Sequence, residues 1–223
     1  MNYIGSKFSI LDFIDETIVN FVRPKDNKLV LCDIFSGTGS VGKYFKKKGY
    51  NIISNDIEYY SYITTKHFIE NNEEIEFTKL KANGIDDVFK YLNELDGIKG
   101  FIYNNYSLEG TTGKEYERQY FSNNNASKID AIRTCIENWN KNNLLEENEY
   151  NFLIASLIES ADKVANTASV YEAFLKKLKK SAEKDILIEP VEILVVDGSD
   201  NNKVYNRDSN ELIREIKGDI LYM

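Results

Sequence analysis

The segment that most constrains the fold is KLVLCDIFSGTGSVGKYFKKKGYNIISND, residues 28–56. It contains an apolar branched run, a glycine-rich turn, an amphipathic helical stretch and a second apolar run. A strand, a helix and a strand in about 30 residues form a βαβ unit, whose two strands run parallel. The sequence therefore predicts an α/β domain built on a parallel sheet.

Further elements are expected on both sides of this unit. Helical spacing of apolar residues predicts a helix from Phe8 to Val22, closed by Pro24, another at 58–69 and a short one within 82–97. Residues 100–121 are aromatic, polar and punctuated by glycines, which predicts a loop-rich segment. Residues 125–184 are expected to be mostly helical, with two amphipathic stripes. Apolar runs predict strands again at 191–196, 202–206 and 219–223, with a helix at 209–216.

The glycine-rich turn has the chemistry of a ligand-binding loop. Residues 37–42, GTGSVG, fit G-x-G-x-x-G between a strand and a helix, where backbone amides can approach a ligand closely. Asp56 ends the next strand, at a place where a carboxylate can accept both ribose hydroxyls of a nucleoside. The alternative is a purely structural turn. The context favours a nucleoside cofactor, and Asp33 just before the loop is atypical of nicotinamide enzymes.

The motif D-x-F-x-G-x-G, followed by a strand ending in Asn-Asp, resembles the S-adenosylmethionine loop of DNA methyltransferases. The opening NYIGSK is similar to the segment before that loop in the adenine-specific (N6), Dam-like or alpha group. VYNRDSNELIREIKGDILYM resembles the group's third strand, its acid, a helix and the fourth strand. ADKVANTASVYEAFLKK resembles part of its target-recognition insertion. ISNDIEYYSY and NTASVY are similar to members that modify CATG.

This resemblance implies a Rossmann-like, S-adenosylmethionine-dependent methyltransferase sheet, here incomplete, with a mostly helical target-recognition insertion. Residues 1–100 would be the first part of the cofactor-binding core, 101–190 the DNA-recognition insertion and 191–223 the return to the core sheet. The expected activity is site-specific methylation of adenine N6 in double-stranded DNA, within a restriction-modification system.

The resemblance also assigns roles to individual residues. Tyr3 and Lys7 would hold the methionine end of S-adenosyl-L-methionine, with Lys7 near its carboxylate, and Asp33 would border the loop. Gly37 and Gly39 would lie beneath the cofactor. Asp56 would bind its ribose, and Asp208 would accept a hydrogen bond from its adenine amino group. A solvated terminus for Tyr3 and Lys7, and a helix cap for Asp208, are the structural alternatives.

In this family the fourth strand leads into Asp-Pro-Pro-Tyr, whose Asp localises the lone pair of the target amino group and whose Tyr stacks on the flipped base. The prolines of this chain are Pro24 and Pro190, which are not adjacent, and the sequence stops at Met223. We therefore expect no catalytic residue here and no activity of the chain alone. It would be one half of a split enzyme, completed by a C-terminal half or a second copy, or a non-catalytic fragment that binds cofactor or DNA.

DNA contacts are expected from the insertion. Tyr106 and Arg118 belong to a Tyr-, Asn- and Gln-rich segment that could stack on bases or read base edges, although an Asn-rich surface loop would have a similar composition. Asn166 and Tyr171 lie in the segment that resembles target recognition. Lys176 and Lys177 follow it and could contact phosphates.

Composition and charge argue against several classes of protein, among them generic polyanion binders and membrane-spanning proteins. The net charge of −8 argues against a generic polyanion binder but leaves room for a local basic patch. No apolar run approaches the length of about 20 residues that a membrane span requires. The opening residues do not have the layout of a signal peptide, so a cytoplasmic protein with no membrane partner is expected.

Overall fold

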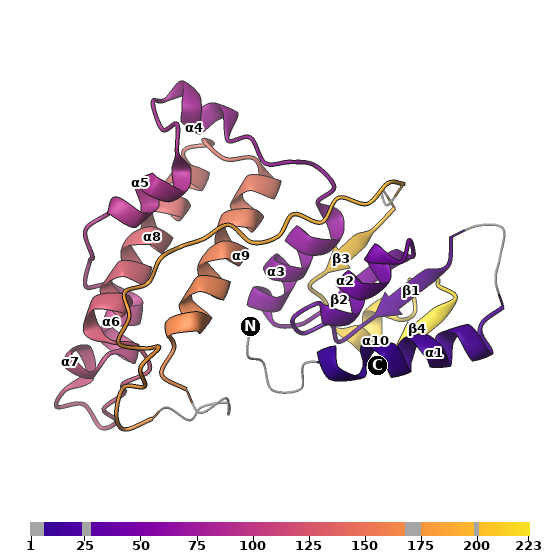
Figure 1. Ribbon diagram of the computed structural model, residues 1–223, viewed down its shortest axis with the longest axis horizontal. Helices are drawn as coiled ribbons and strands as arrows, with labels where there is room; N and C mark the ends of the chain where they lie inside the picture. Colours follow the sequence, from indigo (N-terminus) through magenta and orange to yellow (C-terminus); the bar gives the residue numbers. More distant parts are fainter. Residues whose placement is uncertain (1–6, 24–27, 168–174, 199–200) are drawn as a thin grey trace. The chain divides into compact units, whose positions relative to one another are not determined.

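A computed structural model describes residues 7–23, 28–167, 175–198 and 201–223. The chain forms two compact units (Figure 1). The first, which we call the sheet unit, contains the described residues from 7 to 74 and from 192 to 223. The second, the helical unit, contains the described residues from 75 to 191. The chain thus leaves the sheet unit, builds the helical unit and returns.

The sheet unit is built on four parallel strands in the order β3-β2-β1-β4. Their bounds are β1 Val30–Asp33, β2 Asn51–Asn55, β3 Lys203–Tyr205 and β4 Ile220–Tyr222. Within the register, Cys32 of β1 lies beside Ile53 of β2 and Leu221 of β4. The expected α/β class is confirmed, and the fourth strand lies beside the first.

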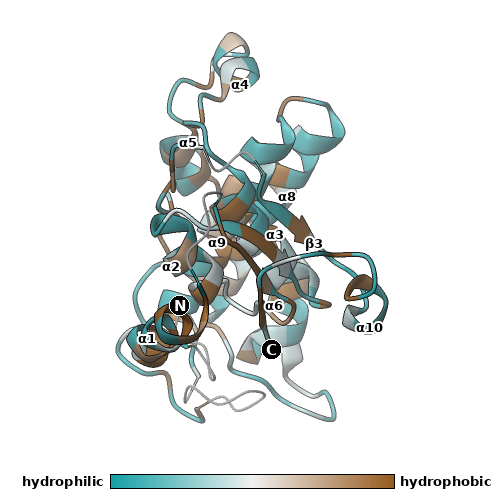
Figure 2. Cartoon of the chain, turned by 90° about the vertical axis from the view of Figure 1, so that its right-hand side faces the viewer, coloured by the Kyte–Doolittle hydropathy of each residue, from teal (hydrophilic) through white to brown (hydrophobic). Residues whose placement is uncertain are grey.

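One face of this sheet is covered by helices that precede and follow β1 and β2. They are η1 Phe8–Ile10, α1 Leu11–Phe21, α2 Ser40–Lys47 and α3 Tyr59–Glu70. Figure 2 shows both brown and teal residues along α1, the pattern of a helix with one buried stripe. The strands and helices share one core, made of Leu11, Ile14, Ile18, Leu31, Val41, Phe45, Ile52, Ile69 and Val204.

Two features fix α2 closely on its neighbours. A side chain at Gly42 would come within 3.1 Å of Ile69 Cδ1 and 3.2 Å of Ser54 Oγ, so glycine allows the helix to approach the sheet. Lys46, further along α2, is fully buried, and its Nζ donates to Phe68 O at 3.0 Å and Asn71 O at 2.9 Å. These carbonyls end α3, so the ammonium caps that helix. Burial lowers the pKa of Lys46 from 10.5 to about 8.

The opposite face of the sheet carries the short helix α10, Ser209–Leu212. A hollow of about 430 Å³ lies there, lined by Ile53, Tyr205 and Leu212 among others. The hydrogen bonds from Ile213 N to Ser209 O and from Ile216 N to Leu212 O extend α10 by further turns. The helix expected at 209–216 is therefore present in its first part.

The helical unit is organised around two long helices of similar length, α8 Asn123–Lys141 and α9 Glu147–Val164, which pack on each other. Ser122 caps α8 by accepting from Asn125 N, and Glu149 Oε2 accepts from Glu146 N at the start of α9. The expected stripe on α8 is buried, and the one on α9 is buried except for Ile158 and Ala161, which are partly exposed. The shorter helices are α4 Thr78–Ala82, α5 Val88–Glu94, α6 Phe101–Tyr106 and α7 Leu108–Thr111.

The prediction that residues 100–121 are loop-rich is wrong for the first half of that segment, which forms α6 and α7. Asp130 of α8 accepts hydrogen bonds from the amides of Gly100, Ile102 and Tyr103, at 2.8–3.1 Å. A carboxylate that accepts the free amides of a helix N-terminus stabilises that helix. Because this cap comes from a distant position in the sequence, the local pattern does not indicate the helix.

The strand expected at 191–196 is also absent from the structure. Its backbone bonds to side chains instead of to another strand: Val191 N donates to Ser156 Oγ, and His67 Nε2 lies 3.0 Å from Glu192 O. A carbonyl can only accept, so His67 carries its proton on Nε2. Burial, the largest influence, lowers the pKa of His67 to about 4.

The helical prediction for 125–184 holds for α8 and α9 and is wrong for residues 175–184, which form turns. Residues 168–174 lie outside the described residues. Across the part of the chain that the structure describes, no helix combines the length and the apolarity needed to cross a membrane.

Candidate functional site

Three acids expected to bind or border a cofactor lie at the carboxyl ends of β1, β2 and β3. Because these strands are parallel, their carboxyl ends share one edge of the sheet, which is where ligands bind in open α/β sheets. Asp33 ends β1, Asp56 follows β2 and Asp208 follows β3. The topology thus brings to one edge side chains that lie more than 150 positions apart in the sequence.

The glycine-rich loop opens α2 at this edge. Gly37 has φ 51° and Gly39 has φ 69°, in the left-handed region that favours glycine. A side chain at Gly39 would also come within 3.1 Å of Thr65 Oγ1. The loop is held by bonds from Ser36 N to Asn55 O and from Gly39 N to Ser36 O. Any larger residue at position 39 would therefore strain the loop.

Asp56 ties this loop to the end of β2. Its Oδ2 accepts from Gly37 N at 2.7 Å, and its Oδ1 accepts from Glu58 N at 2.9 Å. A carboxylate oxygen can accept more than one hydrogen bond, so these contacts leave acceptor capacity on both oxygens. The structure thus joins two of the residues predicted from the sequence, Gly37 and Asp56, in direct contact.

Asp33 is buried beside them, with 1% of its surface exposed. Its Oδ1 has no hydrogen-bond partner among the described residues. Burial raises the pKa of Asp33 to about 7, against the lowering effect of the Phe35 amide and with a further rise from the charge of Asp56. A buried carboxyl group with one unsatisfied oxygen is costly, and a cationic or hydrogen-bonding ligand would satisfy it.

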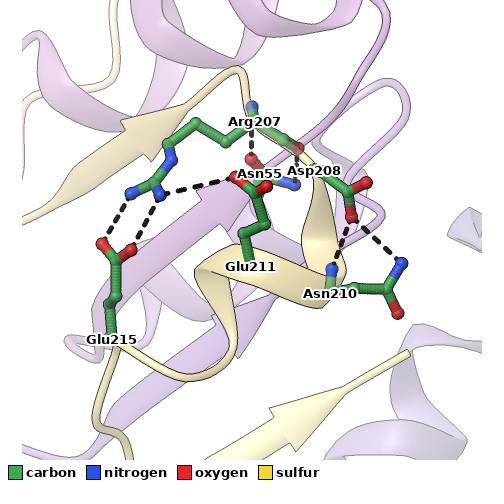
Figure 3. A network of polar contacts seen from close by, with 6 residues as sticks. All are labelled: Asn55, Arg207, Asp208, Asn210, Glu211 and Glu215. Carbon is green, nitrogen blue, oxygen red and sulfur yellow. Dashed lines mark hydrogen bonds and ion pairs between the residues drawn. The ribbon is translucent and has the colours of Figure 1, made fainter.

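Asp208 caps α10, as the structural alternative supposed. Its Oδ1 accepts from Asn210 N at 2.7 Å and from Asn210 Nδ2 at 3.0 Å (Figure 3). Its Oδ2 accepts no hydrogen bond from the residues that the structure describes. The neighbouring Arg207 forms a bidentate ion pair with Glu215, at 2.6 and 2.8 Å. The cap and a ligand contact are compatible, because they use different oxygens.

Two apolar side chains at this edge were missed by the sequence analysis. Phe35 follows the end of β1 and is 62% exposed, and Ile57 follows Asp56 and is 66% exposed. Exposed apolar side chains that follow the acids at strand ends are suited to cover a planar ring. The signal was present in the sequence, because each of them lies one or two positions after an acid that ends a strand.

Lys7 is exposed just before η1, and its side chain has no hydrogen bond or ion pair with the residues that the structure describes. The structure therefore does not bring it to the glycine loop by a direct contact. Tyr3 and Tyr171 lie outside the described residues.

A second candidate site lies on the helical unit, where aromatic and basic side chains predicted to bind DNA come together. The Arg118 guanidinium lies 5.7 Å from the ring centroid of Tyr106, which in turn lies 6.0 Å from the ring of Tyr120. Tyr120 N also donates to Tyr106 O. Arg118 is exposed and Tyr106 partly so, which leaves this cluster open to a large ligand.

Asn166 connects this cluster to the lysine-rich segment. It is fully buried, donates from Nδ2 to Gln119 O and Leu175 O, and accepts from Lys179 N at Oδ1. The predicted DNA contact of Asn166 is therefore corrected: no surface of this side chain is available, and its role is to join residues 119–120 to 175–179. Lys176 and Lys177, on the joined segment, are exposed and have no carboxylate partner among the described residues.

Comparison with known proteins places these features in a family. Residues 3–223 match the D12 class of N6 adenine-specific DNA methyltransferases. The chain belongs to this family. The expected resemblance is thereby confirmed, and with it the use of S-adenosylmethionine as the family's cofactor.

Curated relatives match along the whole chain. The type II methyltransferase M.NlaIII of Neisseria lactamica is 46% identical over 223 residues, which cover all of this chain and 63% of the relative. M.FokI of Planomicrobium okeanokoites is 41% identical, with 34% of its length covered, and M.CviAII of Paramecium bursaria Chlorella virus 1 is 36% identical, with 63% covered. The chain thus spans between about one third and two thirds of these relatives. No solved structure matches significantly.

Proposed function

We propose that the sheet unit binds S-adenosyl-L-methionine and the helical unit binds double-stranded DNA, as parts of a site-specific adenine-N6 methyltransferase of a restriction-modification system. The observation that carries this proposal is the buried, unsatisfied oxygen of Asp33 beside the glycine-rich loop and Asp56. These residues offer a buried acceptor, a backbone that a ligand can approach closely and a second carboxylate, which suits a ligand with an ammonium group and a ribose.

Each polar group of the edge has a counterpart on this cofactor. Asp33 would accept from the amino group of the methionine part, and Gly37 and Gly39 would let that part lie against the backbone. Asp56 would accept from the ribose hydroxyls, and Asp208 would accept from the adenine amino group through Oδ2. Phe35 and Ile57 would cover the apolar faces. When bound, the cofactor supplies an electrophilic methyl group on a sulfonium.

The helical unit would bring the DNA substrate. Arg118 and Tyr106 can contact base edges or stack on an extruded base, and Lys176 and Lys177 can neutralise phosphates. Asn166 would act indirectly, by holding the lysine-rich segment to the backbone of Gln119. Tyr171 remains a proposed DNA contact, and Tyr3 and Lys7 remain proposed cofactor contacts, on the strength of the family resemblance.

A second candidate function is a non-catalytic module that binds cofactor and DNA without transferring a methyl group. The 223 residues contain no adjacent prolines and therefore no Asp-Pro-Pro-Tyr motif, so this function requires only the binding residues that are present. Incubation of the chain with labelled cofactor and a CATG-containing duplex tests the binding module. Incorporated label above the level in a scrambled duplex would show that the 223 residues transfer a methyl group and would exclude a non-catalytic module.

Calorimetry with S-adenosylhomocysteine tests the cofactor site. Asp56→Ala should weaken binding about tenfold or more, because hydrogen bonds to a charged acceptor are lost. Asp86→Ala, which removes an exposed carboxylate of the helical unit, is the matched control and should bind as the wild type does. Nicotinamide dinucleotides should not compete. Equal affinities of Asp56→Ala and the wild type would show that the ribose assignment is wrong.

A further inference from the structure

The side chain of Asn55 joins three strand ends at the cofactor edge. Asn55 ends β2 and is fully buried. Its Oδ1 accepts from Arg207 N at 3.0 Å, and its Nδ2 lies 3.0 Å from Arg207 O, 3.2 Å from Ser209 Oγ and 3.3 Å from Ile34 O. Figure 3 shows this amide facing the backbone of Arg207. Two amide hydrogens therefore serve three acceptors, one on the segment after β1 and two on the segment after β3.

Ser209 completes the link. Its hydroxyl donates to Ile34 O at 3.1 Å, so it accepts from Asn55. Ile34 follows β1 and precedes the glycine-rich loop, whereas Arg207 and Ser209 follow β3. The residue between Arg207 and Ser209 is Asp208, so both neighbours of that carboxylate are held by one buried amide.

We propose that Asn55 is a positioning residue for cofactor recognition, which holds the Asp208 carboxylate where its free oxygen can accept from the adenine 6-amino group. This inference rests on the proposed function, because it concerns the same ligand. The Asp208 side chain is exposed, and its contacts are those of its helix cap with Asn210. The position of its carboxylate relative to Asp56 therefore depends on the backbone of the residues on either side. A second tie, from Asn206 Nδ2 to Asp56 O at 2.7 Å, lies on the same loop.

The chain offers a matched control for this role. Asn202 is also buried in the sheet unit, and its side chain also bonds to backbone: it accepts from Ile52 N at 2.7 Å and donates to Ile69 O at 3.0 Å. These contacts lie near the start of β2, away from the carboxyl edge. Changing either Asn to Asp removes the amide donor and buries a carboxyl group. Both changes should lower stability, but only the change at Asn55 should affect how the adenine ring is recognised.

The experiment compares two ligands by calorimetry: S-adenosylhomocysteine and its analogue in which hydrogen replaces the 6-amino group. The wild type should prefer the first by about tenfold or more, since a site that hydrogen-bonds a group rejects the ligand lacking it. Asp208→Ala and Asn55→Asp should both lose this preference while still binding the analogue. The double variant should show no further loss of preference. Asn202→Asp should keep the preference, with a lowered melting temperature.

The result that would overturn the inference is an Asn55→Asp variant that keeps the wild-type preference. A failure of the proposed function looks different, because the wild type would then bind neither ligand. Should Asn55→Asp not fold, Ser209→Ala removes one link of the same network at a partly exposed position and should reduce the preference in part. A folded Ser209→Ala variant with the full preference would also overturn the inference.

Discussion

The buried ammonium of Lys46 predicts a pH dependence of stability that can be isolated by substitution. In the folded chain its pKa is about 8, against 10.5 ordinarily, because burial penalises the charged form. Between these two values the unfolded chain binds the proton and the folded chain does not. A group whose folded pKa is lowered in this way makes the protein more stable as pH rises through that window.

The size of the effect follows from the two pKa values. Between pH 7 and pH 10, linkage gives a gain in the free energy of unfolding of roughly 2.5 kcal/mol from this one group. Other groups titrate in the same range, so the quantity to measure is a difference between variants. Lys46→Met keeps the unbranched chain and removes the charge, and the free energy of unfolding of the wild type minus that of Lys46→Met should rise by this amount.

Urea unfolding followed by circular dichroism at several pH values provides the assay. Lys47→Met is the matched control, because the neighbouring Lys47 side chain is half exposed and pairs with Glu192 at the surface. Its difference from the wild type should change little with pH. A difference for Lys46→Met that stays flat from pH 7 to pH 10 would show that Lys46 is not desolvated in solution, and would refute the reasoning.

Three further predictions concern the other charged groups. The pKa of Asp33 is raised to about 7, and its ionised form would hold the cofactor's ammonium, so affinity for S-adenosylhomocysteine should fall about tenfold from pH 8 to pH 6. Calorimetry on Asp33→Asn should show weak binding without this pH dependence. A flat pH profile of the wild type would contradict the prediction. Asp130→Ala should lower the free energy of unfolding by about 2–4 kcal/mol, because three amides of α6 lose their acceptor; a loss below about 1 kcal/mol in urea titrations would mean that water replaces the carboxylate. Replacing both Lys176 and Lys177 by Ala should reduce the slope of log affinity for DNA against log salt by about 1.8, and Lys163→Ala, which removes a lysine paired with Glu189, should leave it nearly unchanged. Equal slopes for the double variant and the wild type would exclude phosphate contacts by these lysines.

The parts of the fold that could be predicted are those whose secondary structure is set by the residue pattern of one continuous stretch of sequence. The segment 28–56 contains its strands, turn and helix within one continuous stretch, and the structure forms all of them. The run 191–196 has the same apolar composition as a strand, yet no strand pairs with it among the described residues. Two of its backbone groups bond instead to side chains of distant helices. An apolar run indicates that a segment is buried, whereas a β-strand also needs a neighbouring strand to pair with.

The candidate site also contains residues that could be predicted from the sequence and others that could not. The glycines and Asp56 could be found because their spacing from a strand end is informative, and the structure joins them by a hydrogen bond. Asn55 was read only as part of an Asn-Asp strand end, because its partners Arg207 and Ser209 lie about 150 residues away. Asn166 was expected at the surface, since nothing near it in the sequence shows that backbone groups of residues 119 and 175–179 enclose its amide. The sequence therefore did not reveal which buried polar side chains form hydrogen bonds with residues far away in the chain.

The hydrogen bond of His67 to Glu192 has a spectroscopic consequence. His67 is the single histidine of the chain, so the imidazole region of a proton NMR spectrum contains the resonances of one ring. With its pKa at about 4, this ring should keep the chemical shifts of the neutral form in spectra recorded at pH 5.5, where a solvated imidazole would be mostly protonated. The segment bearing Glu192 is where the chain re-enters the sheet unit. A shift toward the protonated form would therefore signal that this segment has left α3, without any label or substitution.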